Sequence, residues 1–464
     1  MKNPTFEQNP ALREQALNKL QDLRFGIMIT WILFSGMGKE KDAAGGWGAL
    51  THDEERNREL ARTFSKRASR FDADEWARVF KDAGARYVVF VPSHMLDFSL
   101  SRTSLNDFNA GRDYTGELAD ACRKQGLVFG LYIHLATGML YKYNGCLGRR
   151  NEVFGKARVE LGEKQDAYLD AWITEQCTQY QPAFVWLDGW TGIARAIETV
   201  GADPYAVYDF KRIADTIRSC GPDILIGNKM VRPGVTDYRV TDHLFWANNC
   251  KEPLDNSFPS ECSDILPGNE WMALRPEQED FLSAEEISEQ TRLYIKRMIS
   301  GAGRGVNYML NTGPLPNGEL QRVEVAILEG MGAWMKQHGQ TLYGTRPLVG
   351  VDVPWGYVLS KGETVYAHIL DTRDIHKAKG FPLYADSPEM TDMVKRQLKS
   401  GLPEDGRLRI GPLKWTPKTA RLRTGTVGDD AGAMLPMTVE EKFVTIDVSG
   451  VSRDPVDTII ELTE

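Results

Sequence analysis

The sequence predicts an α/β protein in which a closed (β/α)8 barrel, similar to a TIM barrel, is followed by an antiparallel β-sandwich. Up to about residue 345, short apolar runs alternate with amphipathic helical patterns, which indicates βαβ units and a parallel sheet. Beyond that point the runs become short and alternating and are broken by turn residues, as in antiparallel sheets. We therefore expect a catalytic barrel over residues 1–345 and a sandwich over residues 346–464.

Eight apolar runs are candidates for the barrel strands, and eight is the number that a closed barrel needs. Near-continuous apolar residues are expected in them because each strand is covered on both faces. The candidates are residues 24–31, 86–94, 126–134, 182–189, 223–229, 243–247, a poorly marked stretch at 270–274, and 305–313.

The segment from Phe71 to Gly84 illustrates the helices expected between these strands. Asp72 can accept a backbone hydrogen bond at the helix start, with Glu75 three residues further on. Phe71 and Trp76 occupy the two positions of a hydrophobic staple, and Gly84 supplies the left-handed residue that ends the helix. Similar signals predict helices over residues 113–122, 168–177 and 207–217.

The composition is that of an ordinary globular protein. The chain has 464 residues, of which 42% are hydrophobic and 26% charged, so it can build a large core. A net charge of -8 and the lack of a basic run argue against nucleic-acid binding. No apolar run of about 18 residues indicates a membrane span. The polar N-terminus resembles no signal peptide, so we expect a cytoplasmic protein, or a periplasmic or secreted one if a signal was removed.

Catalytic groups of such barrels lie where strands end at the C-terminal face. Asp188 closes the apolar run FVWLDGW, beside Trp186 and Trp190. A carboxylate in that position suits a nucleophile in a sugar-sized pocket. The pattern alone equally allows Asp188 to cap the next helix or to pair with a Lys or Arg.

Glycoside hydrolysis also needs a second carboxyl group, about 5 Å from the first for retention of configuration and about 6.5–9.5 Å for inversion. The candidates on the later loops are Glu252, Glu261, Asp264 and Glu270. The six cysteines form no C-x-x-C pair and the seven histidines form no H-x-H or H-E-x-x-H motif. The sequence also lacks the G-x-S-x-G motif of serine hydrolases. We therefore expect neither a metal nor an organic cofactor.

Several segments, specific in combination, resemble the α-L-fucosidases of glycoside hydrolase family 29. They are RFGIMITWILFS (24–35), FDADEWARVFKDAGARYVVF (71–90), RDYTGELADACRKQGLVFGLYI (112–133), FVWLDGW (184–190) and GVNYMLNTGPLPNGEL (305–320). The resemblance implies a barrel with a C-terminal sandwich and a retaining, exo-acting α-L-glycosidase working by double displacement. It implies that Asp188 is the nucleophile and Glu261 the acid/base, with Glu270 as the runner-up.

The resemblance also suggests which residues would hold the sugar: Thr30, Trp31, His94, Asp97, His134, Trp186 and Trp271. The family usually has a His where this chain has Thr30, and a His-His-Asp-Gly motif where this chain reads Ser93 to Asp97. We therefore expect that the nucleophile strand is kept while the sugar pocket is rebuilt. The expected partner is an oligosaccharide or glycan carrying fucose or a similar L-sugar, with no nucleic acid and no membrane.

Two other functions remain compatible with the sequence. A carbohydrate-binding barrel that has lost turnover would also lack some of the family's pocket residues. An unrelated barrel lyase or isomerase would use a strand-end lysine, and the only one is Lys229, for which a salt bridge is the simpler role. The sequence leaves the formation of a homo-oligomer open.

Overall fold

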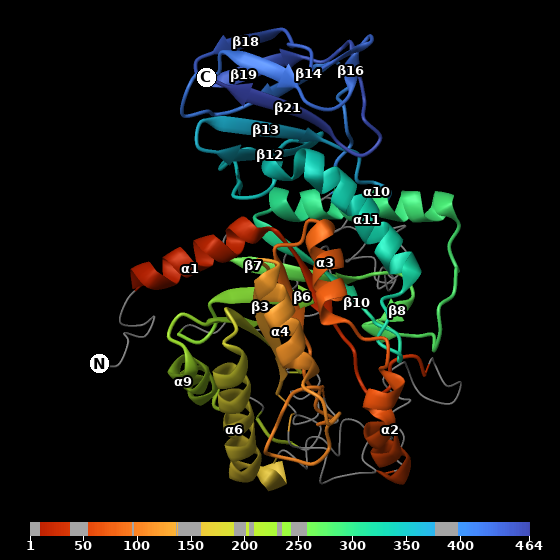
Figure 1. The fold of residues 1–464 in the computed structure, drawn as a ribbon. Helices are drawn as coiled ribbons and strands as arrows, with labels where there is room; N and C mark the ends of the chain where they lie inside the picture. The colour runs from red at the N-terminus through yellow and green to blue at the C-terminus, as the bar shows by residue number, and fades with distance from the viewer. Residues whose placement is uncertain are drawn as a thin grey trace.

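A closed barrel of eight parallel strands forms the larger part of the molecule (Figure 1). The computed structural model describes residues 10–37, 54–94, 97–135, 137, 159–189, 201–203, 208–229, 234–242, 258–375 and 398–464. In chain order the barrel strands are β1 (Phe25–Ile29), β2 (Tyr87–Phe90), β3 (Val128–His134), β4 (Phe184–Asp188), β5 (Leu225–Asn228), β6 (Tyr238–Asp242), β7 (Ser260–Ile265) and β10 (Val306–Thr312). The barrel closes through pairing of β1 with β10, which confirms the predicted fold class.

Helices surround the barrel, and those over residues 73–82, 114–124, 163–180 and 210–220 overlap the four segments that the sequence predicts to be helical. They are α1 (Pro10–Leu23), α2 (Glu54–Arg67), α3 (Ala73–Asp82), α4 (Tyr114–Lys124), α6 (Glu163–Tyr180), α9 (Phe210–Cys220), α10 (Ala284–Gly303), α11 (Arg322–His338) and the 3-10 turn η3 (Gly339–Thr341). At the start of α3 the Asp72 carboxylate accepts a hydrogen bond from the Glu75 backbone N–H at 3.0 Å. The rings of Phe71 and Trp76 pack 4.8 Å apart, so the local signals for this helix are confirmed.

The sixth and seventh strands differ from the prediction. The sixth, β6, comprises residues 238–242 rather than 243–247, and the seventh, β7, comprises residues 260–265 rather than 270–274. Both strands contain polar residues that are buried in hydrogen-bonded or ionic pairs, so a search for apolar runs passed over them. Residues 243–247 lie outside the described part of the chain. Residues 269–273 form a small hairpin of β8 (Asn269–Glu270) and β9 (Met272–Ala273).

The C-terminal region contains the predicted antiparallel sheets. Its strands are β11 (Arg346–Pro347), β12 (Gly356–Lys361), β13 (Thr364–Ile369), β14 (Arg407–Ile410), β15 (Thr419–Leu422), β16 (Thr426–Val427), β17 (Asp430–Ala431), β18 (Met437–Glu440), β19 (Phe443–Asp447), β20 (Val451–Ser452) and β21 (Thr458–Thr463). A five-stranded sheet, β11-β12-β13-β21-β15, and a three-stranded sheet, β14-β19-β18, share one apolar core. Val358 and Ala367 enter that core from the first sheet, and Leu408 and Val444 enter it from the second. This arrangement is a β-sandwich.

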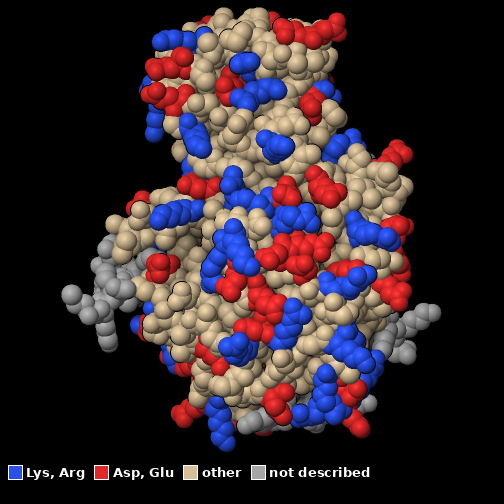
Figure 2. Space-filling model, viewed as in Figure 1, with Lys and Arg blue, Asp and Glu red and all other residues tan. Residues whose placement is uncertain are grey.

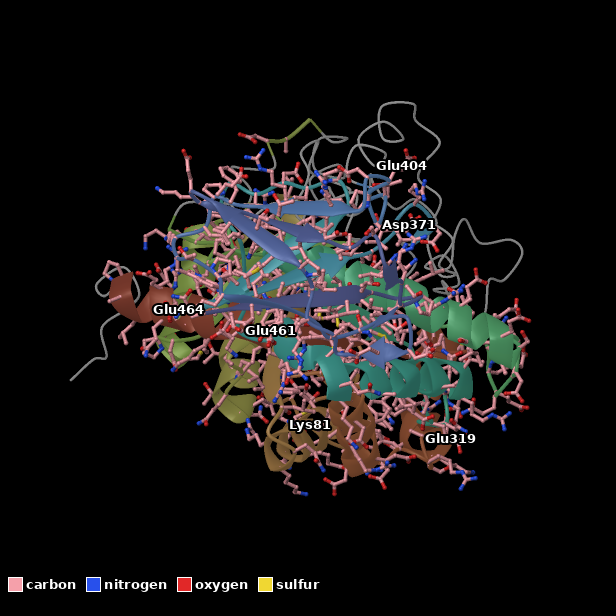
Figure 3. All side chains as sticks on the ribbon, turned by 90° about the horizontal axis from the view of Figure 1, so that it is seen from above. Lys81, Glu319, Asp371, Glu404, Glu461 and Glu464 are labelled. Atoms are coloured by element: carbon pink, nitrogen blue, oxygen red, sulfur yellow. The ribbon has the colours of Figure 1, made fainter. Side chains whose placement is uncertain are left out.

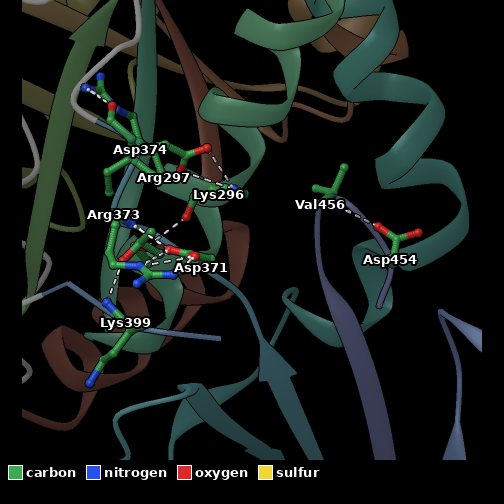
Figure 4. Close-up of polar contacts among 11 residues, drawn as sticks. Lys296, Arg297, Asp371, Arg373, Asp374, Lys399, Asp454 and Val456 are labelled. Atoms are coloured by element: carbon green, nitrogen blue, oxygen red, sulfur yellow. Dashed lines mark hydrogen bonds and ion pairs between the residues drawn. The ribbon is translucent and has the colours of Figure 1, made fainter. Parts of the chain in front are cut away.

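The sandwich lies across the barrel's last helices, as seen from above in Figure 3. At the junction, Lys296 of α10 forms an ion pair with Asp374 at 3.1 Å (Figure 4). The neighbouring Arg297 donates a hydrogen bond to the Ile375 carbonyl at 2.9 Å and forms an ion pair with Asp264 of β7 at 3.1 Å. Asp264 therefore points away from the barrel axis and links a barrel strand to the C-terminal region.

The surface carries charges of both signs. On the face shown in Figure 2, Lys and Arg side chains are intermixed with Asp and Glu side chains, and no continuous basic tract is visible. Within the described ranges, no helix has both the length and the apolar character needed to cross a bilayer. Neither observation indicates a nucleic-acid or membrane partner.

Candidate active site

Asp188 lies at the C-terminal end of β4, directly beside His134 at the end of β3. Its side chain retains 20% of its full exposure, so it is accessible from that end of the barrel. One carboxylate oxygen, Oδ2, accepts a hydrogen bond from the Tyr132 hydroxyl at 2.9 Å. The other, Oδ1, accepts one from the Gly189 backbone N–H at 2.6 Å. The carboxylate is thus held in one orientation by two neighbouring strands.

Lys229, the residue after β5, lies between two carboxylates. Its ammonium nitrogen is 2.8 Å from Asp188 Oδ1 and 2.6 Å from Asp242 Oδ2. The salt-bridge role expected for Lys229 is therefore confirmed. The sequence analysis missed Asp242 because it placed the sixth strand too late. The alternation of Tyr238, Val240 and Asp242 on one face of β6 was the signal that could have found it.

These contacts determine the ionisation of Asp188 and Lys229 at the end of the barrel. Burial alone would raise the pKa of Asp188, but the Lys229 ammonium and the Gly189 N–H outweigh it and lower that pKa to about 2. Burial would likewise lower the pKa of Lys229, yet the carboxylates of Asp188 and Asp242 raise it above its ordinary value. At neutral pH Asp188 is therefore ionised and Lys229 is charged.

Two histidines lie next to this triad. The rings of His94 and His134 are 4.6 Å apart, and His94 Nε2 is 3.1 Å from the Tyr132 hydroxyl. Burial lowers the pKa of His134 to about 4 and holds that of His94 well below its ordinary value. Both rings are therefore neutral at pH 7 and are suited to hydrogen bonding with sugar hydroxyls. The structure brings both predicted residues to Asp188, together with Tyr132, which faces the same side of β3 as His134.

Trp186 and Glu261 form the layer of the barrel interior below Asp188. The Trp186 indole N–H donates to Glu261 Oε1 at 3.0 Å, and its ring stacks on Tyr132 at 5.6 Å. Glu261 is only 1% exposed. Burial raises its pKa to about 7, against the hydrogen bond from Trp186. The expectation that Glu261 lies on a loop is wrong, because it is the second residue of β7 and faces inward.

The β8–β9 hairpin brings Trp271 to the same end of the barrel. Trp271 packs against the apolar residues inside the barrel, and its carbonyl accepts a hydrogen bond from the Asn311 side chain at 2.6 Å. Asn311 in turn accepts one from the Thr30 hydroxyl at 2.7 Å. Thr30 is buried and contacts the site through Asn311. Glu270 precedes Trp271 in β8, but its side chain is outside the described atoms.

One of the residues expected in the sugar pocket, Trp31, lies elsewhere. Trp31 is fully buried between the barrel and the helices α2, α3 and α4. Its ring contacts Phe64, Phe71, Trp76 and Tyr114 at centroid distances of 4.9–5.5 Å. Successive residues of a strand face opposite sides, so Trp31 points outward where Thr30 points inward. Asp97 is buried in a left-handed backbone conformation with φ of 61°. Trp190 and Glu252, named above as neighbours or candidates for the catalytic site, lie outside the described residues.

Among the described residues, no group of His, Cys, Asp and Glu is arranged to hold a metal ion. The site consists instead of an ionised carboxylate, a paired ammonium, neutral imidazoles and indole rings. This set is able to place a nucleophile against a sugar and to bind its hydroxyl groups.

The family model for α-L-fucosidase matches residues 2–340. This chain belongs to the α-L-fucosidase family. Tissue α-L-fucosidase of Macaca fascicularis is 26% identical over 372 residues, which cover 75% of this chain and 68% of that protein. The human tissue enzyme is 25% identical over 350 residues, which cover 70% of this chain and 66% of that protein. The chain therefore spans about two thirds of the length of these glycoside hydrolases.

Solved α-L-fucosidase structures share the fold. Isoenzyme 1 from Paenibacillus thiaminolyticus superposes with a TM-score of 0.66 at 21% identity, covering 98% of this chain and 99% of that one. A family 29 enzyme from Bacteroides thetaiotaomicron, trapped as a covalent intermediate with 2-fluoro-fucosyl fluoride, gives a TM-score of 0.69 at 18% identity. That match covers 100% of this chain and 98% of that one. The α-L-fucosidase fold thus extends over both the barrel and the sandwich.

Proposed function

We propose that the protein is a retaining exo-α-L-fucosidase that removes fucose, or a closely similar L-sugar, from oligosaccharides or glycans. The observation that carries the proposal is Asp188, an accessible and ionised carboxylate at the end of β4. Its carboxylate would attack the anomeric carbon and form a glycosyl ester while the leaving oxygen takes a proton from an acid. Water would then release the sugar with the same anomeric configuration. The covalent intermediate trapped in the Bacteroides relative supports this order of steps.

The residues around Asp188 would orient both the nucleophile and the sugar. Tyr132 and Lys229 fix the two carboxylate oxygens, which lowers the reorganisation needed for attack. The neutral rings of His94 and His134 can bind hydroxyl groups. Trp271 offers an aromatic surface for an apolar sugar face. We further propose that the sugar pocket is altered, since Thr30 bonds Asn311 instead of reaching the site itself.

Two carboxyl groups remain candidates for the acid/base. Glu261 has a pKa suited to a protonated acid at neutral pH. However, a general acid must come within hydrogen-bond reach of the leaving oxygen, and Glu261 is buried and bonded to Trp186. Glu270 belongs to the hairpin that brings Trp271 to the end of the barrel. We therefore propose Glu270 as the acid/base and retain Glu261 as the alternative.

One observation favours a second function, a carbohydrate-binding protein without turnover. Three donors, from Tyr132, Gly189 and Lys229, already engage the Asp188 carboxylate. Hydrogen bonds and an ion pair stabilise its ionised form and thereby weaken it as a nucleophile. If the substrate does not displace one of these donors, the site would bind the sugar without cleaving it.

Release of 4-nitrophenol from 4-nitrophenyl α-L-fucoside tests the proposal. Asp188→Gly should reduce kcat/KM by several orders of magnitude, and azide should restore turnover with a β-linked fucosyl azide as product. Asp120→Ala, at an exposed site on α4, serves as the matched control and should retain full activity. Absence of turnover by the wild type, together with sugar-induced thermal stabilisation, would support the binding protein instead. Turnover retained in Asp188→Gly would refute the assignment of the nucleophile.

A further inference from the structure

A buried carboxyl group that the proposed mechanism does not use lies directly behind the hairpin. Glu324, in the first turn of α11, is completely buried. Its Oε1 atom accepts hydrogen bonds from Asn269 Nδ2 at 2.6 Å and from Gln321 Nε2 at 3.1 Å. Its Oε2 atom accepts one from the Thr312 hydroxyl. Glu324 thus connects three segments: the helix α11, the end of β10 and the base of the hairpin.

The hairpin depends on this connection for its shape. Its turn residue, Trp271, has a φ of 71°, a left-handed conformation that persists for a bulky residue only where the surroundings impose it. The Trp271 backbone N–H donates to Asn269 Oδ1 at 3.2 Å, and the Trp271 carbonyl accepts from Asn311 at 2.6 Å. Asn269 therefore uses one end of its amide to hold Trp271 and the other end to bind Glu324.

The contact between hairpin and barrel is close enough to transmit a displacement. A Cβ atom added at Gly313, just after β10, would lie 2.5 Å from the Ala273 backbone nitrogen and 3.0 Å from Asn269 Cβ. The Gly313 N–H also points to Glu324 Oε1 at 3.4 Å. Little free space therefore separates the hairpin base from the strand end, and loss of the Glu324 carboxyl group must move Asn269 or remove its shortest hydrogen bond, at 2.6 Å.

We propose that Glu324 is a positioning residue for the reaction, which through Asn269 fixes the hairpin that carries Glu270 and Trp271 at the catalytic end of the barrel. This inference rests on the proposed fucosidase function. Glu324 does not touch the sugar. It sets the place of the proposed acid/base and of the Trp271 ring, which is proposed to pack on the sugar.

Three variants distinguish this role from simple structural support. Glu324→Leu keeps the volume but removes the carboxyl group that accepts from Asn269, Gln321 and Thr312. Gln321 keeps its hydrogen bond to the Gly313 carbonyl at 2.7 Å, whereas Asn269 Nδ2 keeps a long one to the Asn311 carbonyl at 3.5 Å. Asn269→Ala removes the connecting side chain and leaves Glu324 in place, so the test survives if the first variant fails to fold. Glu324→Gln keeps an acceptor for Asn269 and should behave as wild type, because burial raises the pKa of Glu324 to about 8 and the native group is mainly neutral at pH 7. Asp457→Asn removes an equally buried carboxylate from the sandwich and serves as the stability control.

Each variant is assayed well below its melting temperature on 2,4-dinitrophenyl and 4-nitrophenyl α-L-fucosides. We expect Glu324→Leu and Asn269→Ala to lose at least about tenfold in kcat/KM, with the larger loss on the 4-nitrophenyl substrate, whose leaving group depends more on protonation. Glu324→Gln and Asp457→Asn should stay near wild type on both substrates. Equal kcat/KM in wild type, Glu324→Leu and Asn269→Ala, or an equal loss on both substrates, would overturn the proposal.

Hydrogen exchange of the peptide spanning residues 266–275 gives a readout that does not require turnover. Exchange should increase in Glu324→Leu and Asn269→Ala and remain unchanged in Glu324→Gln. Unchanged exchange in both disruptive variants would overturn the proposal. If the wild type and Asp188→Gly have the same kcat/KM on every fucoside, the proposed function is refuted. Hydrogen exchange then still decides whether Glu324 fixes the hairpin.

Discussion

Replacing Lys229 with Met tests how the barrel keeps its nucleophile ionised. The ammonium lies 2.8 Å from Asp188 and outweighs the effect of burial on that carboxylate. At about 1.4 kcal/mol per pKa unit, the lowering of the Asp188 pKa from 3.8 to about 2 corresponds to about 2.5 kcal/mol. Lys229 is the first of the groups that lower this pKa, ahead of His134 and the Gly189 N–H, and the variant also exposes Asp188 to the uncompensated cost of burial and to the carboxylate of Asp242.

The pH dependence of kcat/KM reports the ionisation of the free enzyme and therefore measures this change. In the wild type we expect no loss of activity from protonation of Asp188 at any pH above about 4. In Lys229→Met an acidic limb should appear at least about two pH units above the wild-type pKa, because the pKa of Asp188 rises above its ordinary value. Lys229→Arg keeps a positive charge beside Asp188 and Asp242 and serves as the matched control. A profile in Lys229→Met that stays flat down to pH 4 would refute this account.

Two further variants test the layers around the site. Glu261→Gln should change the pH dependence of the free energy of unfolding. The folded-state pKa of Glu261 is about 7, above the ordinary 4.5. Its contribution to wild-type stability is therefore fully present below pH 4.5 and is lost as pH rises through 7, by up to about 3.4 kcal/mol. Urea unfolding at pH 5 and pH 8 should show a smaller loss in the variant than in the wild type, because Glu324, whose pKa burial raises to about 8, contributes the same loss to both proteins. An equal loss in both would contradict the burial argument. Gly313→Ala should destabilise the protein by about 1–3 kcal/mol, since its Cβ would meet the Ala273 backbone at 2.5 Å; an unchanged urea midpoint would show that the hairpin can move aside.

The apolar runs predicted most of the barrel because burial on both faces leaves little choice of residue. The run at residues 182–189 is an example, since β4 (Phe184–Asp188) lies within it. In β7, by contrast, Glu261 is bonded to Trp186 and Asp264 is paired with Arg297. The partners that make these polar residues compatible with burial are distant in sequence. Single-segment periodicity could not identify this strand for that reason.

The same limit applies to the site. Asp188, His94 and His134 could be predicted because each follows directly from the end of an apolar strand. Trp31 was misplaced because the sequence shows which residue ends a strand but not which face that residue occupies. Asp242 was missed because the sixth strand was predicted a few residues too late in the sequence. An error of that size changes which residues are expected to face the inside of the barrel. The register of a strand, more than its composition, therefore decides which of its residues reach the site.

The two buried carboxyl groups, Glu261 and Glu324, are expected to affect different properties: Glu261 the stability of the fold, and Glu324 the reaction. Glu261 faces the middle of the barrel, where it accepts a hydrogen bond from Trp186, whereas Glu324 holds the hairpin at the catalytic end of the barrel. If Glu270 is the acid/base, Glu261→Gln should change the pH dependence of unfolding and leave the ratio of dinitrophenyl to nitrophenyl turnover as in the wild type. Glu270→Gln should raise that ratio strongly, since only the poorer leaving group needs the proton. A raised ratio in Glu261→Gln, with azide rescue of the dinitrophenyl substrate, would assign the acid/base to Glu261 and require Trp186 to move aside when the sugar binds.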